Sequence, residues 1–419
     1  MSHFWHKIMP LDLVYEDFNM KKSIKDLGDI QGKRALVRVD VNVPLDENKN
    51  VTDDTRIRAI IPTVNALKEK GAKIILMAHL GRPKGEWREE FSLAPVAKYM
   101  SKVLGEEVLF VSKPIGEGAD KELEALKDGG VALLENIRYY KAEEAKDDDM
   151  TFANELAKLG DFYVNDAFGA AHRKHTSTAK LAQVLKPAVA GLLMEKELNA
   201  LGGLLANPQR PFTAVVGGAK ISSKIGVLEN LLDKVDNLIV GGGMAYTFIK
   251  ANGGQIGNSI HEDDQMEVAK AIEAKAKAKG VNLVMATDVL AADDFSGNGT
   301  NKVVDVKAIP DGFEGVDAGP NTQKAFEEVI KSSKTILMNG PVGAFENPKF
   351  AQGTKAVLAA IVEATKNGAV SVVGGGDSVS AAKKFCNGED FTHISTGGGA
   401  SLEFIEGKVL PGVDALDEA

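Results

Sequence analysis

Runs of apolar and β-branched residues recur along the chain, and each ends in a polar or glycine-rich loop that a helix-like segment follows. This alternation is typical of βαβ units, whose parallel sheets are buried on both faces. The first half of the chain holds such runs at 34–44, 72–83, 130–140 and 161–173. The second half holds them at 212–220, 237–245, 282–288, 334–346 and 369–377. The pattern predicts an α/β fold built on parallel sheets.

The length of the chain and one segment interrupted by glycines and prolines predict two domains. At 419 residues the chain is longer than one ordinary hydrophobic core supports. In the segment 191–212, leucines at helical spacing precede Gly202, Gly203 and two prolines. We interpret this segment as a connecting helix with a short linker. The alternative is an ordinary surface helix within one domain.

The ends of the apolar runs differ between the two halves. In the first half they carry cations and hydrogen-bonding groups, namely Arg38, Asp40, Asn42, His79, Arg82, Arg138, His172 and Arg173. In the second half they carry glycines, together with Lys220, Lys224, Asn339, Glu346 and Asp377. Open α/β sheets bind ligands beyond the carboxyl ends of their strands. We therefore predict a basic pocket in the first half and a glycine-lined pocket in the second.

Five arginines indicate an anionic ligand in the first half. Four follow or close different apolar runs, and Arg56 stands near the start of a helix with Ile57, Ile60, Ile61, Val64 and Leu67 on its apolar stripe. A single arginine after a strand is usually a solvated surface residue. Guanidinium groups match carboxylates and phosphates with paired hydrogen bonds, so arginines from five segments favour a small, multiply anionic ligand.

Four glycine-rich loops mark the second half: "VVGGAK", "IVGGGM", "VVGGGD" and "STGGGAS". Glycine after a strand either permits close helix–sheet packing or lets backbone amides approach a phosphate. Lys220 and Lys224 stand four residues apart, on one helical face, where two ammonium groups can reach nucleotide phosphates. Asp377 is either a helix N-cap or a ligand of nucleotide-bound Mg²⁺, and the local pattern leaves both open.

Charge and cysteine content narrow the function classes. The formal net charge of −9 argues against a general nucleic-acid binder. Cys386 is the only cysteine, so no intrachain disulfide forms and we expect a reducing, cytoplasmic compartment. No apolar run approaches the roughly 20 residues of a membrane span, so we expect no membrane partner. No cysteine–histidine cluster predicts structural zinc, and no G-x-S-x-G motif predicts a serine hydrolase.

Three functions stay open on these residues: a kinase acting on an anionic metabolite, a dinucleotide-dependent dehydrogenase, and a non-catalytic anion-binding protein. The dehydrogenase rests on Asp236, which lies about 20 residues past Gly217, but a G-x-G-x-x-G motif is missing. The binding protein leaves the lysines and glycine loops of the second half unexplained. Phosphoryl transfer requires chiefly positioning and positive charge, so the pattern favours the kinase.

Nine motifs, in order from about residue 20 to residue 413, resemble phosphoglycerate kinases: "RVDVNVP", "AHLGRPKG", "ENIRYY", "DAFGAAHR", "VVGGAKISSKI", "GGGMAYTF", "NGPVGAFE", "GGGDSVSAA" and "STGGGASLEFIEGKVLPGV". The resemblance implies reversible phosphoryl transfer between 1,3-bisphosphoglycerate with Mg-ADP and 3-phosphoglycerate with Mg-ATP, in glycolysis. It also implies a monomer with two Rossmann-like domains and a cleft that closes.

The implied bounds are 20–190 for the phosphoglycerate domain, 191–211 for the interdomain helix and linker, 212–391 for the nucleotide domain, and 392–419 for a segment returning to the first domain. Residues 1–19 have no counterpart in this pattern and form an N-terminal extension.

The resemblance also assigns site residues. It places phosphoglycerate on Asp40, Asn42, Arg56, His79, Arg82, Arg138, His172 and Arg173. It places the nucleotide on Gly218, Lys224, Gly242, Gly315, Asn339, Glu346, Gly375, Gly376, Asp377 and Ser378, with Asp377 near the metal. Arg56 and Lys220 are expected to stabilise the transferring group, with Gly376 and Gly399 beside it.

Overall fold

The computed structural model describes residues 21–419, which form two compact units. One unit comprises the described residues up to Gly202 together with Val409–Ala419, and the other comprises Gly203–Lys408. The predicted extension 1–19 lies outside the described residues. None of the helices in 21–419 combines the length and the apolar character that crossing a bilayer requires.

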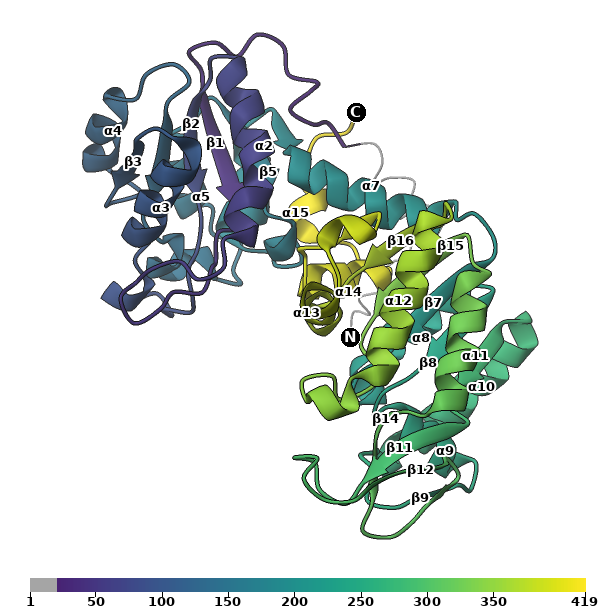
Figure 1. Ribbon diagram of the computed structural model, residues 1–419. Helices are drawn as coiled ribbons and strands as arrows, with labels where there is room; N and C mark the ends of the chain where they lie inside the picture. Colours follow the sequence, from purple (N-terminus) through teal and green to yellow (C-terminus); the bar gives the residue numbers. More distant parts are fainter. Residues whose placement is uncertain (1–20) are drawn as a thin grey trace, which may run out of the picture. The chain divides into compact units, whose positions relative to one another are not determined.

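The first unit is built on a six-stranded sheet in the order β3-β4-β2-β1-β5-β6, with every neighbouring pair parallel. Its strands are β1 (Arg34–Val39), β2 (Lys73–Met77), β3 (Val108–Val111), β4 (Val131–Leu134), β5 (Phe162–Asp166) and β6 (Ala188–Ala190). Helices flank the sheet: α2 (Thr55–Glu69), α3 (Ala94–Leu104), α4 (Glu117–Glu124), α5 (Thr151–Ala157), α6 (Leu181–Val184) and α15 (Pro411–Asp414) (Figure 1). The central strands are buried apart from the half-buried first residues of β1 and β2, because helices cover both faces of the sheet.

Helix α2 shows how the apolar pattern positions one site residue. Of the predicted apolar stripe, Ile57, Ile60, Val64 and Leu67 are buried and Ile61 is half-buried. The chain turns at Gly71 with φ +73°. Because this face is anchored in the core, the first turn of α2 holds Arg56 beside the end of β1.

The second unit has a six-stranded parallel sheet in the order β10-β8-β7-β15-β16-β17, a three-stranded antiparallel sheet β12-β11-β14 and a two-stranded pair β13-β9. The strands are β7 (Phe212–Val216), β8 (Asn237–Val240), β9 (Gln255–Ile256), β10 (Asn282–Met285), β11 (Asp288–Ala292), β12 (Asn301–Asp305), β13 (Ala308–Ile309), β14 (Glu314–Ala318), β15 (Thr335–Asn339), β16 (Val370–Val373) and β17 (His393–Ile394). The helices are α8 (Ile225–Leu231), α9 (Ala245–Ala251), α10 (Met266–Lys279), α11 (Pro320–Lys331), α12 (Gln352–Lys366), α13 (Gly376–Phe385) and α14 (Gly399–Ile405). Both large sheets are Rossmann-like, which agrees with the expected α/β fold.

Helix α7 (Leu192–Ala206) contains the boundary between the units. It starts at the end of β5, where Asp166 Oδ1 accepts hydrogen bonds from the amides of Leu193 (2.9 Å) and Met194 (3.1 Å). These two amides would otherwise be orphaned at the helix N-terminus, so the buried carboxylate fixes where α7 begins.

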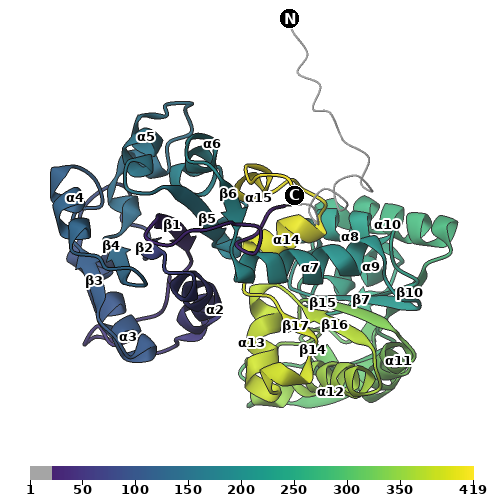
Figure 2. The ribbon, with the colours of Figure 1, turned by 90° about the horizontal axis from the view of Figure 1, so that it is seen from above.

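The C-terminal segment of the first unit starts at Val409, later than the 392 that the resemblance implied. Ala188 of β6 donates its amide to Asp417 Oδ2 at 2.9 Å, and α15 lies beside β6 in Figure 2. The preceding helix α14 packs on α8 in the second unit instead, because Phe404 and Ile405 are buried there and Asn230 donates to the Ile405 carbonyl.

Candidate active site

In the first unit, the predicted phosphoglycerate residues follow four adjacent strands, in the order β4-β2-β1-β5. Asp40 and Asn42 come after β1, His79 and Arg82 after β2, Arg138 after β4, and His172 and Arg173 after β5. The carboxyl ends of parallel strands meet at one edge of the sheet, so these residues share that edge.

Two of these residues, Asp40 and Asn42, are hydrogen-bonded to Arg56 of α2. Its Nη1 donates to Asp40 Oδ1 at 3.0 Å and to the Asn42 carbonyl at 3.1 Å. Asp40 also accepts the Asn42 amide at 3.1 Å, so one carboxylate orders the loop and holds the guanidinium. The Arg56 side chain is 38% exposed and can therefore meet a ligand while it stays anchored.

Gly81 links Asn42 to Arg138. Its amide donates to Asn42 Oδ1 at 3.0 Å, and its carbonyl accepts Arg138 Nη1 at 3.0 Å. Arg138 also lies 3.1 Å from Glu144 through Nε. Burial lowers the pKa of Arg138, and Glu144 opposes that shift. The segments after β1, β2 and β4 are thus held by direct hydrogen bonds.

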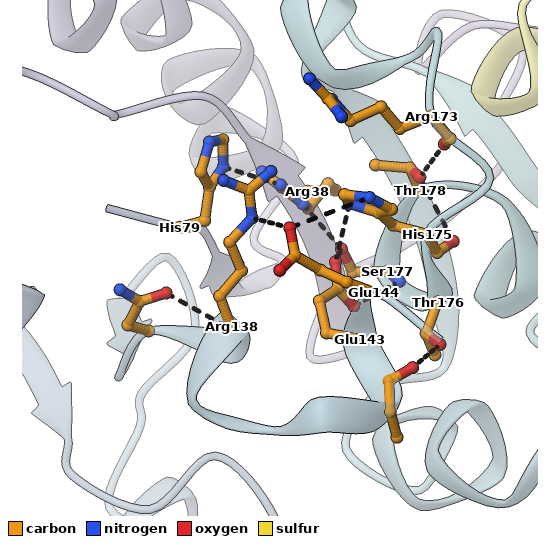
Figure 3. A network of polar contacts seen from close by, with 12 residues as sticks. Arg38, His79, Arg138, Glu143, Glu144, Arg173, His175, Thr176, Ser177 and Thr178 are labelled. Atoms are coloured by element: carbon orange, nitrogen blue, oxygen red, sulfur yellow. Dashed lines mark hydrogen bonds and ion pairs between the residues drawn. The ribbon is translucent and has the colours of Figure 1, made fainter. Parts of the chain in front are cut away.

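His79 is a neutral hydrogen-bond donor. Burial lowers its pKa well below the usual value, and the positive charges of Arg38, Arg138 and Arg56 lower it further. Arg38 Nη2 lies 3.0 Å from His79 Nδ1 (Figure 3). A guanidinium has only donors, so Nδ1 must accept and the ring hydrogen sits on Nε2. His79 can therefore donate Nε2–H to an anion without exchanging a proton.

The remaining predicted residues of the first unit are more exposed than Asp40, His79 and Arg138. Arg82 and Arg173 are exposed, and His172 is half-buried. Arg173 and His172 lie close enough to lower the pKa of the neighbouring His175, which burial above all reduces to about 3. The structure thus brings Asp40, Asn42, Arg56 and Arg138 into one bonded set and leaves Arg82 and Arg173 extended at its rim.

In the second unit, two cavities that share Gly218, Ala219 and Asp377 lie beyond the adjacent strands β8, β7, β15 and β16. The first has a volume of about 280 Å³ and is lined by Lys220, Lys224, Gly340, Gly375–Ser378 and the Gly217–Ala219 turn. The second has a volume of about 310 Å³ and contains Gly242, Gly315 and Glu346 in its lining. Every predicted nucleotide residue except Asn339 lines one of these cavities.

Asn339 does not line the first cavity but is hydrogen-bonded to Lys224, which does. Its Oδ1 accepts from Lys224 Nζ and its Nδ2 donates to the Gly374 carbonyl at 3.2 Å. Ser378 Oγ accepts the Gly340 amide, which fixes the adjoining turn. Burial lowers the pKa of Lys224, and the carboxylates of Asp377 and Glu406 oppose the shift. The Lys224 ammonium therefore lacks full solvation and is ready for an anionic partner.

The glycines serve two distinct purposes. A Cβ on Gly217 would lie 2.0 Å from the Pro341 carbonyl oxygen, and one on Gly340 (φ +118°) would lie 2.0 Å from the Gly217 carbonyl oxygen. These two allow close packing of the backbone. A Cβ on Gly376 would meet no atom within 4 Å, so Gly376 leaves open space at the start of α13.

Asp377 is not the N-cap of α13, because the helix begins at Gly376 and Gly375 (φ +88°) precedes it. The carboxylate is exposed in the first turn of α13 and lines both cavities. Within the described residues no three His, Cys, Asp or Glu side chains gather to hold a metal. One carboxylate beside an anion pocket fits Mg²⁺ that arrives with nucleotide phosphates, since such sites use few protein ligands.

Several residues lie elsewhere than the sequence reasoning expected, or were missed. Asp236 lies at the amino end of the sheet, where it accepts the Phe212 amide at 2.7 Å and pairs with Arg210, so it is no ribose-binding acid. Gly399 begins α14 and lines neither cavity. The apolar side chains of Ile260 and Phe295 were missed although they line the second cavity and are 41% and 57% exposed. No local motif marks such residues.

Comparison with known proteins gives one consistent family. The family model described as phosphoglycerate kinase matches residues 24–408. The chain is 53% identical over 401 residues to a chloroplastic phosphoglycerate kinase of Arabidopsis thaliana, covering 95% of this chain and 83% of that protein. It is also 53% identical over 401 residues to a cytosolic phosphoglycerate kinase of Triticum aestivum, covering 95% of this chain and 99% of that protein. The solved phosphoglycerate kinase of Coxiella burnetii matches with a TM-score of 0.86 at 41% identity, covering 94% of this chain and 98% of that one. The chain therefore belongs to the phosphoglycerate kinase family.

Proposed function

We propose that this chain transfers a phosphoryl group between the acyl phosphate of 1,3-bisphosphoglycerate and Mg-ADP, giving 3-phosphoglycerate and Mg-ATP, reversibly. The observation that carries the proposal is that each unit presents a different kind of anion site at one edge of its large sheet. One sheet edge presents anchored arginines and a neutral histidine donor, and the other presents a lysine among open backbone amides. The first suits a small acid phosphate and the second suits a nucleotide.

On the phosphoglycerate side, we assign binding to the eight residues that the motifs indicated. Asp40 and Asn42 order the loop and hold Arg56. His79 donates Nε2–H, and Arg138 brings a charge from the neighbouring strand end. We assign Arg82, His172 and Arg173 to the same phosphate, and the two arginines are exposed enough to close on it.

On the nucleotide side, the cavity with Gly242, Gly315 and Glu346 is proposed to hold the base and ribose. Its apolar walls suit a purine, and the open glycines allow a ring to lie against the backbone. The phosphates are assigned to the cavity with Gly218, Lys224, Asn339 and Gly375–Ser378. Asp377 would hold Mg²⁺, which when bound offsets phosphate charge.

Catalysis then rests on position and charge. The ionised carboxylate of 3-phosphoglycerate and the terminal oxygen of ADP are already nucleophiles, so no general base is required. Arg56 and Lys220 are assigned to stabilise the moving phosphoryl group. Gly376, at the start of α13, is assigned to approach it with its backbone amide.

A coupled assay tests the function directly. Turnover is recorded with 3-phosphoglycerate, ATP and Mg²⁺, and again with each component omitted. The proposal expects turnover only when all three are present. A folded protein that binds 3-phosphoglycerate without turnover would leave an anion-binding protein and remove the catalytic assignments.

The wider setting is also a proposal. We propose that the chain acts as a monomer in the cytoplasm, without nucleic-acid or membrane partners. The net charge of −9 supports the absence of a nucleic-acid partner, and the single cysteine supports a reducing compartment. Size-exclusion chromatography with light scattering tests the monomer against the chain mass of 44.6 kDa.

A further inference from the structure

A buried carboxylate lies behind the phosphoglycerate pocket and has no part in the proposed mechanism. Glu143, at the end of a short 3₁₀ turn (Lys141–Glu143), is fully buried. Both of its oxygens accept from Ser177: Oε1 from the hydroxyl at 2.7 Å and Oε2 from the amide at 2.9 Å. Figure 3 shows the two residues facing one another. The carboxylate thereby determines where the Ser177 hydroxyl hydrogen points.

Ser177 holds Arg38 in the position from which Arg38 contacts His79. Because the Ser177 hydroxyl donates to Glu143, its oxygen is free to accept from Arg38 Nε at 2.8 Å. Arg38 is itself completely buried, and its other nitrogens donate to the Val39 carbonyl and to His79 Nδ1. When Glu143 is ionised, each link has one possible direction, because a guanidinium only donates and an ionised carboxylate only accepts.

Burial and the neighbouring cations act on the pKa of the Glu143 carboxyl in opposite directions. Burial raises its pKa to about 7, while Arg38 and the hydrogen bonds from Ser177 oppose the shift. Arg138 also faces it, and His175 Nδ1 lies 3.9 Å from Oε1. The Tyr163 hydroxyl donates to the Ser177 carbonyl at 2.8 Å and steadies the segment from the strand side. Burying an ionised carboxylate costs free energy unless hydrogen-bond partners compensate. Here the partners form one hydrogen-bonded chain from Glu143 through Ser177 and Arg38 to His79.

We propose that Glu143 is a positioning residue for the phosphoglycerate pocket, which fixes the tautomer and orientation of His79 through Ser177 and Arg38. With Nδ1 engaged, Nε2 carries the hydrogen and His79 donates to an anionic ligand. The opposite tautomer would present a lone pair to that anion and weaken binding. The identity of the ligand rests on the proposed function, whereas the tautomer of His79 does not.

The test uses Glu143→Gln and Ser177→Ala in the full chain. Glutamine cannot accept both Ser177 groups, because one of its termini is a donor. Losing a hydrogen bond to a charged group corresponds to roughly a tenfold effect or more. We expect the KM for 3-phosphoglycerate to rise roughly tenfold, with the KM for ATP unchanged. In ¹⁵N spectra of the histidine rings, assigned with His79→Gln, the wild type should show the Nε2–H form of His79 and both variants a shifted tautomer population.

Two further variants sharpen the test. The double variant Glu143→Gln/Ser177→Ala should be no worse than the more impaired single variant, because both changes break the same hydrogen-bonded chain. Asp288→Asn is the matched control: this buried carboxylate caps α11 by accepting the amides of Asn321 (3.1 Å) and Thr322 (2.8 Å), and it contacts neither anion site. We expect Asp288→Asn to lower thermal stability and leave both KM values unchanged.

Two results would overturn the proposal. One is a loss of stability in Glu143→Gln and Ser177→Ala with the His79 tautomer and the KM for 3-phosphoglycerate both unchanged. The other is an equal rise in both KM values, which would indicate general loosening of the structure. Absence of turnover in the wild type would refute the proposed function alone, since the His79 spectra are recorded without substrate and still decide the role of Glu143.

Discussion

The buried carboxylate of Asp166 makes the stability of this chain depend on pH in a predictable direction. Asp166 is completely buried at the start of α7, and burial raises its pKa from 3.8 to about 6 despite the opposing hydrogen bonds of Thr63, Met194 and Leu193. The folded state therefore holds this proton more tightly than the unfolded state does. The stabilising contribution is fully present below about pH 3.8 and is lost as the pH rises through about 6.

The magnitude follows from the size of the shift. Two pKa units correspond to about 3 kcal/mol of differential stability. In Asp166→Asn the amide oxygen can still accept from Leu193 and Met194, but the group no longer titrates. Relative to the wild type, the variant should therefore gain roughly 3 kcal/mol of stability between pH 4 and pH 7.

Urea unfolding followed by circular dichroism, at intervals from pH 4 to pH 8, measures this difference. Other groups titrate in both proteins, so the free energy of unfolding of the wild type is subtracted from that of the variant at each pH. A difference that stays constant across the range would refute the reasoning. A difference that falls with pH would show that the α7 N-terminus stabilises the ionised form more than burial penalises it.

Two further predictions concern the proposed chemistry. Arg56→Ala should keep the wild-type melting temperature, because the side chain is 38% exposed, and should lower kcat by roughly 10³-fold; a loss below about tenfold would make Arg56 a binding residue only. Removing Mg²⁺ with EDTA should weaken ATP binding in calorimetry and leave 3-phosphoglycerate binding unchanged, because Asp377 lies in the nucleotide unit. Equal weakening of both ligands would contradict the assignment of the metal to Asp377.

Sequence patterns predicted the strands that carry the site because those strands are buried on both faces. The runs after which the site residues stand became β1, β2, β4 and β5 in one unit and β7, β8, β15 and β16 in the other. The edge strands β3, β6 and β17 were not predicted, and neither was the small sheet β12-β11-β14. The edge strands β3, β6 and β17 are short, and β12 alternates between exposed and half-buried positions, so the apolar signal of these four strands is weak.

The pattern of cations in the sequence identified the sheet edge that carries the proposed phosphoglycerate site. It did not predict how deeply each cation is buried. Arg38 and Arg56 look alike in the sequence, yet Arg38 is completely buried and Arg56 is partly exposed. Depth depends on segments far apart in the chain, since Ser177 is 139 residues from Arg38. For the same reason Glu143 carried no signal: next to Glu144 it resembles a solvated surface charge.

The glycine loops posed a choice between close packing and phosphate binding, and the structure divides the glycines between the two. Gly217 and Gly340 each pack against the other's segment, so an added methyl group would meet backbone oxygen at 2.0 Å. Gly376 has no atom within 4 Å of that position and lines the proposed phosphate cavity. We therefore expect Gly217→Ala to lower the melting temperature strongly. Gly376→Ala should leave it unchanged while raising the KM for ATP, because the methyl group occupies space that the phosphates require. If Gly376→Ala retains the wild-type KM for ATP, the open space at the start of α13 is not where the phosphates bind, and the nucleotide must be assigned to other amides of the same sheet edge.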